Sequence, residues 1–428
     1  MAFGKNFPKF DYYDIVVVGA GPAGTTAARF AAMSGARVLV LEKDRDVGYP
    51  VRCGEAVSHE GLVQFIEPNP KWIASTVRYF KLVAPDGTVI KPNIEGFGYI
   101  LERRIFDYEL AKLATYYGAE IVTKAYVNGL IMNDGKVEGV KVLLNNSEQI
   151  EIRAKIVIGA DGVESRVGRW AGLNTTCKLQ DMESAVQMTL TNINVEPDTC
   201  YFYFGEKVAP GGYLWVFPKG ENTANVGLGI AGIYGRQKHA LSYLEEFVEK
   251  NFPNASILTV IAGGVPCAKT ADKIVTHGLM LVGDAAHQVN PVSGGGIISG
   301  MIGGKIAGQI AGEAIKKNDL NLIFNYENEW RKTLGQRHER YYKIKQFIYK
   351  FSDEKLNEIA NLFLQKYSMI KSSRVFHLST PCVSSVKNLL SSSLSSSDLS
   401  SMSRSLSRYE SVLSTRFKIL TAMPRGPL

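Results

Sequence analysis

The residues best suited to chemistry begin with a glycine-rich turn near the start of the chain. Gly19-Ala20-Gly21-Pro22-Ala23-Gly24 follows a β-branched run at 15–18 and precedes a helix-like stretch at 25–34. In this context Gly19 permits a tight turn, Gly21 lets a pyrophosphate approach the backbone, and Gly24 lets helix and strand pack closely. Glu42 ends the next apolar run, where a carboxylate can accept hydrogen bonds from ribose hydroxyls and repels a 2′-phosphate. The motif therefore predicts a site for FAD or NAD rather than NADP.

Two glycine-aspartate elements further along the chain decide between FAD and NAD. Gly159-Ala160-Asp161-Gly162 and Gly283-Asp284-Ala285-Ala286 each follow an apolar run, and the second leads into Gly294-Gly295-Gly296-Ile297. An aspartate at a strand end can bond the ribityl chain of a flavin, and a glycine turn that opens a helix brings N–H groups and the helix dipole toward the ring. Negative charge on a reduced flavin is stabilised there. In this order, after the first turn, the elements indicate FAD.

A cysteine and three aromatic residues are the candidates for contact with a substrate. Cys53 lies in a glycine-flanked loop beside Arg52, whose charge favours the thiolate, although an inert loop thiol is the alternative. Tyr213, Trp215 and Phe217 alternate along one expected strand, so their side chains share a face. They can form an aromatic wall that stabilises positive charge, and ordinary core packing is the alternative.

The elements that must position these residues alternate between strands and helices. Strands are expected at 15–18, 37–41, 120–131, 136–143, 151–158 and 279–282, with helices at 25–34, 104–117 and 297–314. Segment 182–264 alternates apolar and polar residues between turns, which predicts a mainly antiparallel sheet. We therefore expect a mixed α/β (α+β) fold, in which a Rossmann-like FAD-binding domain carries an inserted antiparallel substrate domain and a helical C-terminal region. The expected parts are the FAD-binding domain at 1–175, with a small insertion at about 57–100; the substrate domain at 176–270; the second part of the FAD-binding domain at 271–330; the helical region at 331–370; and a Ser-rich, basic, disordered tail at 371–428.

Composition excludes several classes of protein. The 428 residues are 45% hydrophobic and 21% charged, which is the balance of a globular chain, and no apolar run is long enough to span a membrane. The five cysteines are scattered without metal-ligand spacing and no secretory leader is visible, so we expect a reducing cytoplasm and no metal site. Much of the net charge of +8 falls in the Ser-rich tail. The nearly neutral remainder argues against a nucleic-acid partner.

Together these motifs resemble the FAD-dependent superfamily built on the hydroxybenzoate hydroxylase fold, and within it the geranylgeranyl reductase family. The resemblance runs from about residue 14 to residue 371. Pro50-Val51-Arg52-Cys53-Gly54-Glu55 is similar to the family's PxxCG element, and Tyr213-x-Trp215-x-Phe217-Pro218-Lys219, followed by Gly227-x-Gly229, is similar to its YxWxFP…GxG element. The chain looks closest to the archaeal branch, which saturates the isoprenoid chains of membrane ether lipids.

The resemblance implies a set of site residues. It places catalysis on Cys53, Tyr213 and Trp215. Beside the three glycines of the first turn, Gly19, Gly21 and Gly24, the implied FAD contacts are Ala23, Glu42, Cys53, Gly54, Ala56, Arg103, Asp284, Gly296 and Ile297, with Val127 from a strand of uncertain register.

The implied reaction is hydride transfer from reduced flavin to an isolated double bond, with a proton from one acid in a closed apolar cavity. The implied partners are a prenylated ether phospholipid, the inner face of the cell membrane, which a cytoplasmic protein meets peripherally, and an external electron donor such as reduced ferredoxin, another reduced cofactor or NAD(P)H. Three alternatives stay open: an FAD-dependent aromatic hydroxylase, a geranylgeranyl reductase of chlorophyll synthesis, and a non-catalytic flavin electron carrier.

Overall fold

A computed structural model describes residues 8–93 and 95–373, with the side chains of the last helix described as far as Gln365. The Ser-rich tail expected from residue 371 lies, from residue 374 onward, outside the described residues.

The first sheet is the parallel core of the expected FAD-binding domain. Its strand order is β17-β18-β11-β1-β2-β8, and β10 and β9 continue from β11 as an antiparallel pair. Ile15, Val16 and Val17 of β1 are fully buried, as β-branched residues are in a sheet covered on both faces. The strands are β1 (Tyr12–Val18), β2 (Val38–Leu41), β8 (Glu120–Val122), β9 (Ala125–Asn133), β10 (Lys136–Leu144), β11 (Glu148–Gly159), β17 (Val275–Thr276) and β18 (Leu279–Leu281).

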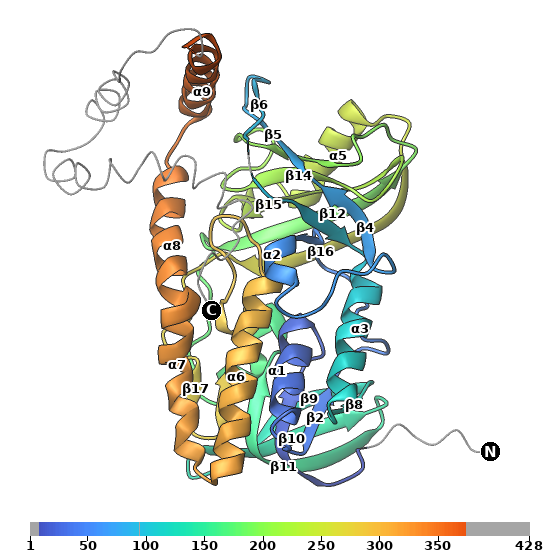
Figure 1. The fold of residues 1–428 in the computed structure, drawn as a ribbon, viewed down its shortest axis with the longest axis vertical. Helices are drawn as coiled ribbons and strands as arrows, with labels where there is room; N and C mark the ends of the chain where they lie inside the picture. The colour runs from blue at the N-terminus through green and yellow to red at the C-terminus, as the bar shows by residue number, and fades with distance from the viewer. Residues whose placement is uncertain (1–7, 94, 374–428) are drawn as a thin grey trace, which may run out of the picture.

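Three helices, α1 (Pro22–Ala32), α3 (Arg103–Tyr116) and α6 (Ile297–Lys317), stand together in the lower half of the molecule (Figure 1). α6 lies unusually close to α1, because a Cβ placed on Gly304 would come within 2.3 Å of the carbonyl oxygen of Ala23. The start of α1, which carries the glycine-rich turn, is thus held by a helix from far along the chain.

The second sheet forms the upper half of the molecule (Figure 1), in the order β16-β12-β15-β14-β13-β5-β6. All its pairings are antiparallel except that of β13 with β5, so the segment expected as a small insertion at 57–100 extends this sheet at its β13 edge. Helix α5 (Ala240–Asn251) packs on β12 and β15. The strands are β5 (Tyr79–Val83), β6 (Val89–Ile90), β12 (Met182–Thr191), β13 (Thr199–Tyr203), β14 (Tyr213–Pro218), β15 (Thr223–Ala231) and β16 (Ser256–Pro266).

Shorter elements connect the two halves. A three-stranded sheet of β3 (Ala56–Ser58), β7 (Gly98–Leu101) and β4 (Ile73–Val77) lies with α2 (His59–Leu62) beside the cysteine loop. α4 (Arg166–Trp170) and short turns of 3-10 helix at Gly162–Glu164, Tyr234–Arg236, Gly283–Ala286 and Leu320–Phe324 complete the connections.

The C-terminal region is helical, as expected. α7 (Asn325–Trp330), a π-helical turn at Arg331–Gly335 and α8 (Gln336–Ile348) form one continuous rod beside α6, and α9 (Asp353–Ser373) follows near the second sheet (Figure 1). Among the helices in the described part of the chain, none has the length and apolar character needed to cross a membrane.

Candidate functional site

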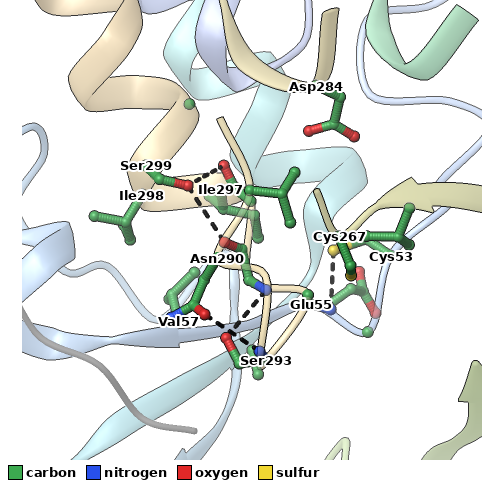
Figure 2. A pocket seen from close by; sticks show the side chains of 18 of the residues that line it. Cys53, Glu55, Val57, Cys267, Asp284, Asn290, Ser293, Ile297, Ile298 and Ser299 are labelled. Carbon is green, nitrogen blue, oxygen red and sulfur yellow. Dashed lines mark hydrogen bonds between the residues drawn. The ribbon is translucent and has the colours of Figure 1, made fainter. Parts of the chain in front are cut away.

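A cavity of about 450 Å³ is lined by residues from both sheets, a size typical of small-molecule sites. Asp284, Ile297 and Cys53 point toward the same open space, although Cys53 comes from a segment far from the other two in the chain (Figure 2). The predicted site residues that line the cavity are Gly21, Ala23, Gly24, Cys53, Gly54, Ala56, Arg103, Tyr213, Trp215, Asp284, Gly296 and Ile297.

Three predicted residues lie outside this lining. Gly19 has φ +104°, and a Cβ there would come within 2.3 Å of a carbonyl oxygen of the loop after β11, so it shapes the turn. Both Glu42 carboxylate oxygens accept backbone N–H groups, Oε2 from Ala20 at 2.8 Å and Oε1 from Asp44 at 3.0 Å, so Glu42 braces the glycine-rich loop. Val127 is 5% exposed within β9. Contacts of these residues with a flavin stay predictions.

The start of α1 has the form of a pyrophosphate site. The first N–H groups of a helix have no partner within it and carry partial positive charge. A Cβ on Gly24 would overlap the carbonyl oxygen of Gly19 at 2.0 Å, whereas a Cβ on Gly21 would meet nothing within 4 Å. Gly24 is therefore required by packing, and Gly21 leaves the cavity side of the turn free for the close approach of a phosphate.

The start of α6 suits the flavin end of the same cofactor. Asp284 follows β18, and a Cβ on Gly296, the residue before α6, would lie 3.2 Å from its Oδ1. Burial raises the pKa of Asp284 to about 6, and the charge of Arg103 opposes part of that rise. Arg103 is itself held by Asp107 through two hydrogen bonds of 2.6 and 2.7 Å. An acceptor for ribityl hydroxyls and a helix start for the ring therefore face the same cavity as the pyrophosphate turn, and these residues fit FAD.

The cysteine loop is fastened to the second sheet through a glutamine. The indole Nε1–H of Trp215 donates to Gln187 Oε1 at 2.9 Å, and Gln187 Nε2 donates to the carbonyl oxygen of Cys53 at 3.0 Å. Gly54 lies against the wall as well, because a Cβ there would be 3.1 Å from the Phe217 ring. Loop and wall therefore form one surface.

The expectation that Cys53 favours the thiolate is wrong. Burial raises the pKa of the thiol, and the cation that opposes burial is Arg103 rather than the exposed Arg52. The thiol is therefore neutral. Adjacency in sequence did not predict this, because the exposed Arg52 side chain lies along β16, where a Cβ on Gly263 would be 3.6 Å from its Cδ.

The aromatic wall forms as the alternation predicts. Tyr213, Trp215 and Phe217 of β14 all line the cavity, with ring centroids 5.8 Å apart for the first pair and 6.1 Å for the second. The Tyr213 hydroxyl donates to the backbone carbonyl of Ser293 at 2.6 Å. On neighbouring β15, a Cβ on Gly227 would come within 2.6 Å of the indole. The first glycine of the Gly227-x-Gly229 element therefore makes room for Trp215.

Two buried carboxylates of the site were not predicted from the sequence. Glu55 accepts hydrogen bonds from the Arg103 backbone N–H at 2.9 Å, from Lys219 Nζ at 2.6 Å and from Asn225 Nδ2 at 2.6 Å, and so joins the cysteine loop to α3 and the second sheet. Glu183 lines the cavity from β12. Glu55 is the last residue of the PxxCG-like element and Lys219 the last of the YxWxFP-like element, and these positions are the only sequence feature that points to the pair. No neighbouring residue in the sequence points to Glu183.

Comparisons with known proteins agree with this geometry. The family model of the geranylgeranyl reductase catalytic domain matches residues 181–265, and that of the NAD(P)-binding Rossmann-like domain matches residues 17–69. The digeranylgeranylglycerophospholipid reductase of Methanocella arvoryzae is 46% identical over 355 residues, which cover 82% of this chain and 90% of that protein. The enzyme of the same name from Methanosarcina acetivorans is 44% identical over 389 residues, covering 89% and 95%.

Solved structures show the same relationship. A geranylgeranyl bacteriochlorophyll reductase-like protein from Thermoplasma acidophilum superimposes with a TM-score of 0.78 at 38% identity, covering 82% of this chain and 91% of that chain. A flavin-dependent brominase, with a TM-score of 0.63 at 17% identity over 82% and 93% of the two chains, shares the fold alone.

Proposed function

The chain belongs to the digeranylgeranylglycerophospholipid reductase family, and from this premise we propose that it is an FAD-dependent reductase of archaeal ether phospholipids. It saturates the double bonds of their geranylgeranyl chains. The observation that carries the proposal is one cavity in which the dinucleotide turn and the start of α6 face the aromatic wall of segment 181–265.

In the proposed assignment, residues at the two ends of the cavity bind different parts of FAD. Gly21 and Gly24 would receive the pyrophosphate, Asp284 the ribityl hydroxyls, and the backbone at Gly296 and Ile297 the ring. Bound FAD, once reduced, supplies a hydride for the double bond.

The chain's own residues provide the surroundings that an isolated alkene needs. No carbonyl polarises such a bond, so partial positive charge develops on carbon and must be kept from water. The faces of Tyr213, Trp215 and Phe217 exclude water and stabilise that charge. Cys53, a neutral thiol fastened to this wall, is proposed to contact the reacting region.

We also propose that the protein works from the cytoplasm at the inner face of the membrane. Its lipid substrate resides there, and β16 presents Ile257, Leu258 and Val260 with 51%, 60% and 52% of their surfaces exposed. The proposed electron donor is external, such as reduced ferredoxin or another reduced cofactor. Flotation with anionic archaeal-lipid vesicles tests the location, and a protein that stays wholly in the soluble fraction contradicts it.

An anaerobic product analysis tests the function. Protein with bound flavin is reduced with dithionite and given either a geranylgeranyl ether phospholipid or a geranylgeranylated chlorophyll precursor. We expect mass spectrometry to show hydrogen pairs added to the phospholipid. An unchanged phospholipid beside a saturated pigment supports the chlorophyll alternative, hydroxylation of small aromatics in oxygen supports the hydroxylase, and reoxidation by a protein acceptor alone supports the electron carrier.

A further inference from the structure

Three acidic side chains line the cavity within the described residues: Glu55, Glu183 and Asp284. Both oxygens of Glu55 are engaged by the cation and N–H donors described above. Asp284 lies at the flavin end, where it would bond the cofactor. Glu183 is therefore the one of these three acids that neither the surrounding residues nor the cofactor would fully engage.

Glu183 is buried, with 6% of its surface exposed, and its two oxygens differ. Oε1 accepts a hydrogen bond from the Tyr349 hydroxyl at 2.7 Å and lies 3.8 Å from Lys345 Nζ. Oε2 is buried with no hydrogen-bond partner. A charged oxygen left in this way is costly, whereas a protonated one carries no charge to solvate.

Two glycines leave space on the cavity side of this free oxygen. A Cβ on Gly212 would lie 2.9 Å from Glu183 Oε2, and a Cβ on Gly229 would lie 3.5 Å from it. Both glycines line the cavity, and Gly229 is the second glycine of the Gly227-x-Gly229 element. A side chain on Gly212 would therefore collide with the free oxygen, whereas Gly229 lies at ordinary contact distance from it.

The charges around Glu183 leave it able to hold and release a proton. Burial raises its pKa to about 7, while Lys345 and the Tyr349 hydroxyl act against that rise and Asp181 adds to it. Asp181 is paired with Lys345 at 3.5 Å. The other titratable groups of this cluster are the thiols of Cys177 and Cys267 and the phenol of Tyr213, all with a pKa raised by burial.

We propose that Glu183 is the acid that protonates the substrate double bond, an inference that rests on the proposed function. As the O–H bond of Glu183 breaks, one alkene carbon gains a C–H bond from that proton. The neighbouring carbon takes the hydride that reduced FAD would supply. The remaining carboxylate, stabilised by Lys345 and Tyr349, regains its proton from water.

The Glu183→Gln variant tests this, because it keeps the shape of the side chain and removes the acid. We expect it to bind and retain flavin normally while the single-turnover rate of lipid saturation falls by about 100-fold or more. The wild-type rate is expected to fall as pH rises through about 7, since only the protonated acid can donate. The variant loses this pH dependence.

Two further variants should shift the pH at which the rate falls, in opposite directions. Tyr349→Phe removes a hydrogen bond that lowers the Glu183 pKa, so the fall in rate moves to higher pH. Asp181 is a matched control, because it is a buried carboxylate paired with the same lysine but is not among the residues that line the cavity. Asp181→Asn removes a negative charge that raises the Glu183 pKa, so the fall in rate moves to lower pH. Infrared titration of flavin-free protein supplies a readout independent of turnover. The wild type is expected to show the carbonyl stretch of two protonated acids, one lost near pH 6 from Asp284 and one lost near pH 7 from Glu183, and Glu183→Gln is expected to lack the second.

The outcomes separate the two proposals. A wild type that leaves the lipid unchanged contradicts the proposed function and with it the role of the acid. A working wild type beside a Glu183→Gln variant of equal rate and unchanged pH profile overturns the role of Glu183 alone, as does an infrared titration that is the same in the wild type and the variant.

Discussion

The close approach of α6 to α1 predicts that two chemically identical substitutions on α6 differ in their effect on stability. In Gly304→Ala the new methyl group would sit 2.3 Å from the Ala23 carbonyl oxygen, and it needs about 3.5 Å, so the helices must separate by about 1 Å. In Gly300→Ala the nearest atom, Ala23 Cβ, is at 3.4 Å, an ordinary contact. Overpacking costs about 1–3 kcal/mol, and alanine returns up to about 1 kcal/mol of helix propensity at either position. We therefore expect Gly304→Ala to be destabilised by about 1–2 kcal/mol and Gly300→Ala to be as stable as the wild type or slightly more so.

Thermal unfolding of flavin-free protein measures this difference, which corresponds to a fall of roughly 1–3 °C in Tm for Gly304→Ala. Because Ala23 lies in the pyrophosphate turn, FAD affinity measured by fluorescence should fall in Gly304→Ala also. Equal Tm values for the two variants, together with unchanged FAD affinity in Gly304→Ala, would refute the argument that this glycine exists for helix contact.

The remaining predictions concern the site. Cys53→Ala should keep its flavin and lose most of its saturation activity in single-turnover assays, and an unchanged rate would reduce Cys53 to a lining residue. Glu55→Ala should cost about 2–3 kcal/mol in urea unfolding, because the ammonium of Lys219 loses its buried partner and keeps only the more exposed Glu102 at 3.0 Å, and Lys219→Met added to it should restore part of that loss. A double variant no more stable than Glu55→Ala alone contradicts the pairing. The raised pKa of Asp284 means that its favourable contribution to stability, present below about pH 4, is lost as pH rises through about 6. Flavin-free Asp284→Asn should therefore gain about 2–3 kcal/mol over the wild type above that pH while binding FAD more weakly, and equal stability at all pH values contradicts this.

Much of the first domain could be predicted because its determinants are local. The β-branched run of β1, the glycine spacing after it and the apolar run of β2 specify strand, turn and helix within a short stretch of chain. The alternation along β14 likewise predicted which side chains share a face. Each of these features depends on residues that are neighbours in sequence.

The parts that sequence analysis missed depend on partners far apart in the chain. Lys219 reaches Glu55, and Tyr349 reaches Glu183, only after the two halves have packed together. The pairing of β5 with β13 is of the same kind, since no local pattern reveals which sheet edge receives a short strand. The protonation state of Cys53 was mistaken for this reason too, because burial rather than the adjacent residue decides it.

The most direct test of the central claim is an anaerobic single turnover. Protein with reduced flavin is mixed with geranylgeranyl ether phospholipid while the visible spectrum is recorded, and the lipid is then analysed by mass spectrometry. We predict that the spectrum of oxidised flavin returns without oxygen and that one double bond is saturated for each flavin reoxidised. A flavin that stays reduced beside the lipid, or one that reoxidises while the lipid gains no hydrogen, would contradict the assignment.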